Sequence, residues 1–81
     1  MQKIILKSFE NSSVIKLSMW NPDTQDLIIV FSSGSIWRYA KVPYVVCWSL
    51  YSAESSGNYF NKNIRGKYEE FSIYKPGVPI V

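Results

Sequence analysis

The first half of the chain alternates between apolar and polar residues. Between Val14 and Trp20 every second side chain is apolar, which predicts a β-strand with one buried face. The run Leu27–Phe31 is continuously apolar, and Ile36–Ala40 follows it after a glycine-containing turn. Together with the turn residues NPDTQD, these segments predict three antiparallel strands in a meander. An apolar segment at Gln2–Phe9 predicts a further strand at the N-terminus.

The second predicted hairpin has two possible registers. A two-residue loop would pair Phe31 with Ile36 and place Trp37 and Tyr39 beside the even-numbered residues of Leu27–Phe31. A three-residue loop would pair Phe31 with Trp37 and place both aromatics beside the odd-numbered ones. A slip of one residue moves every side chain of a strand to the opposite face. We favour the three-residue loop because it gathers the bulkiest side chains on one face.

The spacing of apolar residues becomes helical after Pro43, a residue that suits the first turn of a helix. The positions that recur at this spacing are Val46, Cys47, Leu50 and Ala53. Ser55 or its neighbour can cap a second short helix, in which Phe60 and Ile64 lie four residues apart on one face. Gly66 is well placed to end this helix.

These elements predict an α+β fold in a single domain, residues 1–81. The fold is a small antiparallel β-meander of three to five strands, followed by two short helices packed on one face. Within residues 69–81, the sequence EEFSIY can form a last strand before a proline-broken tail. Both faces of Leu27–Phe31 are apolar, and two short helices can hardly cover both. We expect the N-terminal strand or a partner subunit to cover the second face, most simply in a twofold homodimer.

The composition excludes most catalytic chemistry. The chain has no histidine and one cysteine, Cys47, so it can form neither a Cys/His zinc site nor a nucleophile paired with histidine. Its six acidic residues are scattered, and the adjacent Glu69 and Glu70 would face opposite ways on a strand. We expect a protein without enzyme activity, metal or cofactor. The lone cysteine and the lack of a signal-like or membrane-spanning segment indicate a cytoplasmic protein, in the host cytoplasm if a phage encodes it.

The stretch Ser55–Tyr68 is basic and aromatic, contains no acid, and is the candidate ligand surface. Cationic groups, amides and aromatic rings are the groups that contact phosphates and stack on bases. Two aromatics from the predicted strand Ile36–Ala40 complete the candidate binding surface. Its residues are Trp37, Tyr39, Tyr59, Asn61, Lys62, Arg65, Lys67 and Tyr68. In the alternative reading, Asn61 and Arg65 tie the helix to the sheet through backbone carbonyls. Core packing is also expected of Trp37 or Tyr39, because a helix must cover that face.

The segments NPDTQDL, VFSSGSIWRY, KVP and SSGNYFNKNIRGKY closely resemble the KTSC domain. This short module is named for its occurrence at the C-terminus of some lysyl-tRNA synthetases. It also occurs alone in bacterial and phage proteins, the type that this chain resembles. The resemblance covers about residues 13–68, and Trp37 stands where the family's Tyr-x-Tyr motif has its first tyrosine. What the resemblance implies is RNA binding, which has been proposed for the family from its attachment to a synthetase.

Three functions are therefore open. The chain is a module that binds single-stranded nucleic acid, a bacterial or phage effector that binds and modulates a host protein, or a dimer that sequesters a small nucleotide. A net charge of +3 and a pI near 9.1 are compatible with a polyanionic ligand. We favour RNA binding, because the family resemblance and the basic, aromatic stretch agree.

Overall fold

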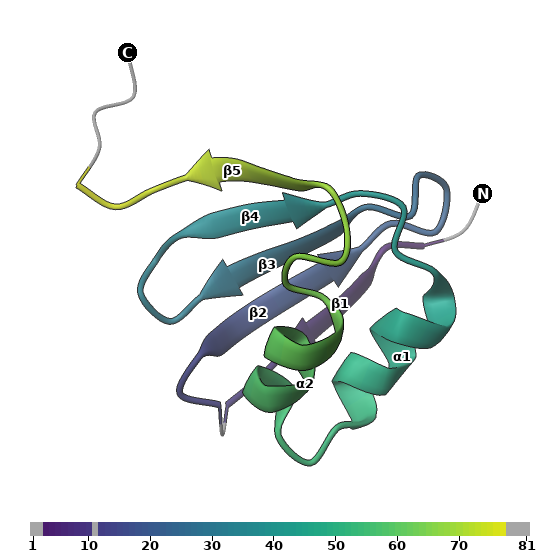
Figure 1. The fold of residues 1–81 in the computed structure, drawn as a ribbon, viewed down its shortest axis with the longest axis horizontal. Coiled ribbons are helices and arrows are strands. Elements are labelled where there is room, and N and C mark those ends of the chain that lie inside the picture. The colour runs from purple at the N-terminus through teal and green to yellow at the C-terminus, as the bar shows by residue number, and fades with distance from the viewer. Residues whose placement is uncertain (1–2, 11, 78–81) are drawn as a thin grey trace.

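The computed structural model describes residues 3–10 and 12–77, and these form a five-stranded antiparallel sheet with two helices. The elements are β1 (Ile5–Ser8), β2 (Ile15–Trp20), β3 (Leu27–Phe31), β4 (Ile36–Tyr39), α1 (Tyr44–Ser52), α2 (Ser56–Asn63) and β5 (Glu70–Tyr74). The strands lie side by side in chain order, and both helices cover the same face of the sheet (Figure 1). The predicted α+β meander is confirmed, with the helices inserted between β4 and β5.

The two outer strands differ from their predicted extents. β1 begins at Ile5 within the predicted Gln2–Phe9, of which Gln2 lies outside the described residues. It pairs with β2 and extends the sheet sideways. The expectation that this strand covers the second face of β3 is therefore wrong, because its backbone hydrogen bonds hold it at the sheet edge. At the opposite edge β5 starts at Glu70 and pairs with β4.

The β3–β4 hairpin has the predicted three-residue loop but a different pairing. Trp37 lies opposite Ile29, so the predicted pair of Trp37 with Phe31 is wrong by two residues. The Phe31 N–H donates to the Ser35 carbonyl at 2.9 Å, and the turn between them uses Gly34 at a φ of +99°. The chain therefore reverses sooner than predicted. A shift of two residues preserves the face, so Trp37 still lies on the side of Ile29 and the helices.

The helices begin where the sequence predicts. Pro43 precedes α1, and the Ser55 hydroxyl caps α2 by accepting a hydrogen bond from the Asn58 N–H at 3.3 Å. Gly66 lies in the turn after α2 with a φ of +74°, a backbone conformation that favours glycine. Neither described helix has the length and apolar character that a membrane crossing requires.

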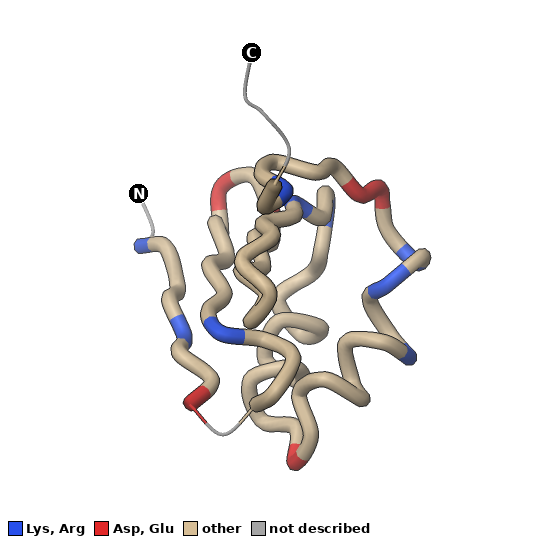
Figure 2. The backbone as a smooth tube through the Cα atoms, turned by 90° about the vertical axis from the view of Figure 1, so that its left-hand side faces the viewer, with Lys and Arg blue, Asp and Glu red and all other residues tan. Residues whose placement is uncertain are grey.

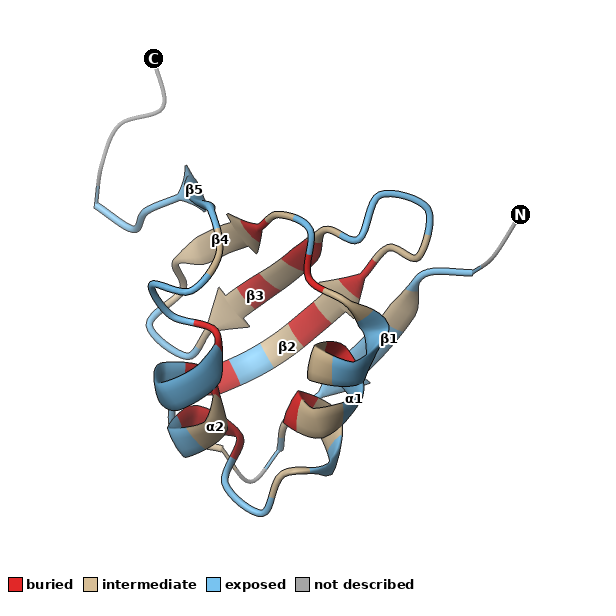
Figure 3. Cartoon of the chain, turned by 45° about the vertical axis from the view of Figure 1, so that its right-hand side comes forward, coloured by how far each residue is buried: buried red, intermediate tan, exposed pale blue. Residues whose placement is uncertain are grey.

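The core lies between the sheet and the two helices, where Figure 3 shows the buried residues of β2 and β3 facing α1 and α2. Phe60 and Ile64 are buried in it as predicted, and so is Cys47. The indole N–H of Trp20 donates to the Val42 carbonyl at 2.9 Å. This hydrogen bond fixes the segment that leads from β4 into α1.

The opposite face of the sheet is apolar and open. The strand registers place Leu6, Met19, Ile28, Arg38 and Phe71 in one row across all five strands on this face. Leu6 is 62% exposed and Phe71 39% exposed, and the Arg38 guanidinium lies 4.5 Å from the centre of the Phe71 ring. No described helix covers this row, since both helices lie on the other side (Figure 1).

Candidate ligand-binding pocket

A pocket with a volume of about 500 Å³ opens on the helical face, between α2 and the strands β3, β4 and β5. Its apolar lining includes Val14, Phe31, Trp37 and Phe60. Its polar lining includes Tyr39, Asn61, Arg65, Glu70 and serines of the β3–β4 turn. We call this cavity the aromatic pocket. It brings together four of the residues that the sequence analysis selected, namely Trp37, Tyr39, Asn61 and Arg65.

Packing of aromatic rings holds the floor of the aromatic pocket in place. The Phe60 ring meets Phe31 and Tyr39 edge to face, with ring centres 5.3 and 5.4 Å apart. Such pairs favour a defined mutual orientation. Tyr39 is only 3% exposed, so its ring belongs to the core and cannot serve as the predicted stacking surface. Trp37 is half-buried and therefore keeps part of its indole accessible to a ligand.

The Tyr39 hydroxyl is a further polar group of the residues that line this pocket. Burial raises the pKa of Tyr39 to about 12, with a smaller increase from the Glu70 carboxylate and an opposing decrease from Arg65. Within the described part of the chain the hydroxyl finds no hydrogen-bond partner. It is therefore available to a ligand.

Glu70 is a pocket residue that the sequence analysis did not select. It lies directly opposite Tyr39 in the β4–β5 pairing. Its Oε1 atom accepts a hydrogen bond from the Gly66 N–H at 2.8 Å, which ties the carboxylate to the turn after α2. The sequence signal was limited to the alternation of Glu69 and Glu70, which puts only one of the two carboxylates on the helical face. The sequence did not specify that the Glu70 carboxylate and Arg65 would line the same pocket.

Asn61 and Arg65 are both exposed. The alternative reading gives their side chains hydrogen bonds to backbone carbonyls. For residues 3–10 and 12–77 the structure shows no such bond from either side chain. Both side chains line the aromatic pocket instead, with their polar groups free for other contacts.

The other selected residues lie outside the pocket lining. Lys62 and Lys67 are exposed, in the last turn of α2 and in the turn after it. Tyr59 and Tyr68, two of the candidate binding residues, are half-buried and pack against the core. Figure 2 shows the lysine and arginine positions spread over several separate segments of the chain. A ligand would therefore meet separate cationic side chains, such as Lys62 next to Asn61 in the chain, rather than an extended basic face.

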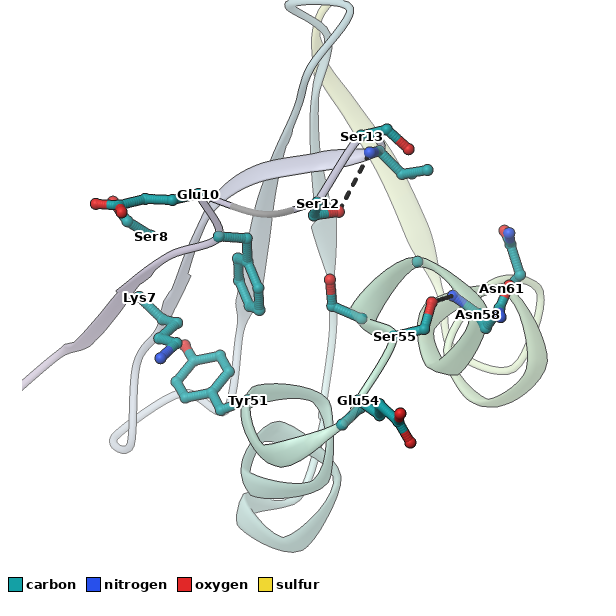
Figure 4. A pocket seen from close by; sticks show the side chains of 15 residues that line it. Lys7, Ser8, Glu10, Ser12, Ser13, Tyr51, Glu54, Ser55, Asn58 and Asn61 are labelled. Carbon is teal, nitrogen blue, oxygen red and sulfur yellow. Dashed lines mark hydrogen bonds between the residues drawn. The ribbon is translucent and has the colours of Figure 1, made fainter.

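A second cavity of about 440 Å³ lies between β1, the end of α1 and the start of α2 (Figure 4). Several of its serines have structural roles. The Ser12 hydroxyl accepts from the backbone N–H groups of Val14 and Ile15, and the Ser55 hydroxyl caps α2. Its charged lining is mixed, with Lys7 beside two glutamates. We therefore regard the aromatic pocket as the better candidate site.

Comparisons with known proteins agree with the fold and with the resemblance in the sequence. The KTSC domain model matches residues 11–68. A lysine–tRNA ligase of Nostoc sp. is 48% identical over 62 residues, covering 74% of this chain and 11% of the ligase. An uncharacterized protein of Stutzerimonas stutzeri is 34% identical over 60 residues, covering 74% of this chain and 84% of that protein. The crystal structure of a KTSC domain protein from Yersinia pestis superposes with a TM-score of 0.81 at 28% identity, covering 89% of this chain and all of that one. The chain thus spans only about a tenth of the ligases that it matches.

Proposed function

The chain belongs to the KTSC domain family, and we propose that it binds single-stranded nucleic acid, RNA in particular, with one base in the aromatic pocket. The observation that carries this proposal is the pocket itself, which combines an accessible indole at Trp37 with polar groups at Asn61 and Arg65. Unpaired bases are commonly held by stacking on aromatic rings and by hydrogen bonds to their edges. The ligases that match this chain carry tRNA in their name, which supports RNA as the ligand.

In this proposal the base stacks on Trp37, and the backbone phosphates of the RNA strand pass over the end of α2. Lys62 and Lys67 are exposed beside the pocket and would contact those phosphates. Each phosphate neutralised on a single strand contributes about −0.7 to the slope of log affinity against log salt. Two such contacts give a slope of about −1.4, which is a modest salt dependence.

The test is a fluorescence-anisotropy titration of a labelled single-stranded RNA at two salt concentrations. The double variant Lys62→Ala/Arg65→Ala is expected to lose about tenfold or more in affinity, because it removes a phosphate contact and a pocket contact. The control is Lys3→Ala/Lys7→Ala, which removes the same charge at the opposite edge of the sheet. No binding by the folded wild-type protein, or an equal loss in both double variants, would refute the proposal.

We also propose that two copies associate through the open apolar face of the sheet. Exposed apolar residues occupy both edges of this face, with Leu6 on β1 and Phe71 on β5 exposed by 62% and 39%. Arg38, the charged residue in the row described above, already has a partner in the same chain, since its guanidinium lies 3.8 Å from the Asp26 carboxylate. An identical copy would therefore cover this face without burying an unpaired charge, and sheets commonly pack face to face in this way.

Analytical ultracentrifugation of matched variants tests the dimer. Leu6→Lys is expected to give a monomer, because it places an unpaired charge in the interface. Val45→Lys is the control, since Val45 is 64% exposed on α1, away from the open face. A wild-type monomer at high protein concentration, or equal dissociation of both variants, would contradict the proposed interface.

A further inference from the structure

We propose that the aromatic pocket selects guanine over the other bases, with Glu70 as the residue that reads it. This inference rests on the proposed function and adds the identity of the bound base. It follows from the arrangement of one carboxylate, one guanidinium and one free hydroxyl around a pocket with an aromatic floor.

The carboxylate sets the first requirement. An ionised carboxylate only accepts hydrogen bonds, and its two oxygens suit a pair of adjacent donors. Guanine offers such a pair on its Watson–Crick edge, the N1–H and the N2 amino group. In adenine and cytosine a ring nitrogen with a lone pair lies beside the amino group, and in uracil two carbonyl oxygens flank the single N–H. Each of these three bases would direct a lone pair at the Glu70 carboxylate.

The guanidinium sets the second requirement. Arg65 lines the same pocket and can only donate hydrogen bonds. The O6 and N7 atoms of guanine are two adjacent acceptors, and arginine recognises them in a bidentate manner. Glu70 and Arg65 together therefore present acceptors and donors that match two neighbouring edges of the same base. Adenine has an amino group where guanine has O6, so it would set donor against donor at Arg65.

The Glu70 carboxylate is positioned before any ligand arrives. Its Oε1 atom accepts a hydrogen bond from the Gly66 N–H at 2.8 Å, which leaves Oε2 and the second lone pair of Oε1 for the two donors of a base. The β4–β5 pairing places Glu70 directly opposite Tyr39, which is 3% exposed and whose hydroxyl has no partner among the described residues. A hydroxyl in this position can donate to O6 of the base. A base that sets like groups against Glu70 and Arg65 leaves them unpaired in the complex, so a base that pairs with them gains over one that does not.

The experiment compares labelled uridine oligonucleotides that carry a single central guanosine, adenosine, cytidine or uridine. The wild-type protein is expected to bind the guanosine oligonucleotide about tenfold more tightly than the others, which is the discrimination typical of one bidentate contact. In Glu70→Gln one oxygen becomes an amino group, so the preference for guanosine should fall and adenosine should gain relative to it. The glutamine still offers an oxygen to the Gly66 N–H, so the fold is retained.

Glu69→Gln is the matched control, because it makes the same charge change at the neighbouring position, outside the pocket lining. This control is expected to keep the guanosine preference. Equal wild-type binding of all four oligonucleotides would overturn the guanine inference and leave the proposed function standing, and so would the same loss of preference in Glu69→Gln and Glu70→Gln. If no oligonucleotide binds, both proposals fail. Competition by free GMP but not AMP would support the selective pocket without requiring the neighbouring phosphates.

Discussion

Replacing Tyr39 by phenylalanine tests the account of the pocket by its effect on stability at alkaline pH. At neutral pH the change should be nearly neutral, within about 1 kcal/mol, because the ring keeps its contact with Phe60 and the lost hydroxyl has no partner. The effect should appear only where the phenol ionises. Burial raises the pKa of Tyr39 from 10.0 in the unfolded chain to about 12 in the fold.

The sign of the effect follows from proton binding. Between pH 10 and 12 the Tyr39 phenol is ionised in the unfolded chain and still protonated in the folded one. The unfolded state then binds fewer protons, so the free energy of unfolding of the wild-type protein falls as the pH rises. One group costs about 1.4 kcal/mol per pH unit in this interval, so the wild-type protein should lose about 1.4 kcal/mol from this phenol by pH 11.

Urea unfolding followed by circular dichroism, at neutral pH and near pH 11, measures this loss. Tyr39→Phe has no phenol at this position, so it should become more stable than the wild-type protein by about 1.4 kcal/mol near pH 11. Ionisation of all other groups affects both proteins and cancels in the difference. Tyr74→Phe, on exposed β5, is the control for removing a tyrosine. Parallel pH profiles of the wild-type protein and Tyr39→Phe would refute the burial of the Tyr39 phenol as the cause of its raised pKa.

Two further variants test the packing around the pocket. Trp20→Phe removes the indole N–H that donates to the Val42 carbonyl at 2.9 Å, and should lower the free energy of unfolding by about 1–3 kcal/mol in urea titrations. Trp48→Phe, at a position 58% exposed, should change it little, and equal losses would contradict the role of the hydrogen bond. Gly34→Ala should cost about 1–2 kcal/mol, since its φ is +99° and the added Cβ would lie 3.1 Å from Cγ of Pro76. An unchanged thermal midpoint for Gly34→Ala would refute this reading of the turn.

Local patterns predicted the elements and the buried face of the second helix, where Phe60 and Ile64 are both buried. In Ile15–Trp20 the alternation predicted a buried face with Ile15, Leu17 and Met19, and this is wrong for Leu17 and Met19: an irregularity between Ile15 and Leu17 turns Ser18 and Trp20 into the core instead. Alternation did put Trp37 on the helical face although its predicted partner was wrong, because an even shift of register preserves the face. Asn61 on α2 and Arg65 in the turn after it are close in the chain, so local reasoning could select both as candidates.

The folded protein was needed to show that Glu70 and Arg65 line one pocket, and that Tyr39 belongs to the core while Trp37 stays accessible. These relations depend on the pairing of β5 with β4, two strands that are separated by both helices. Every residue of β5 is exposed, so no buried face in its sequence specifies its register. Backbone hydrogen bonds and an irregularity between Ile36 and Trp37 set that register instead. The chemistry of the pocket therefore rests on a long-range pairing that local hydrophobic periodicity does not encode.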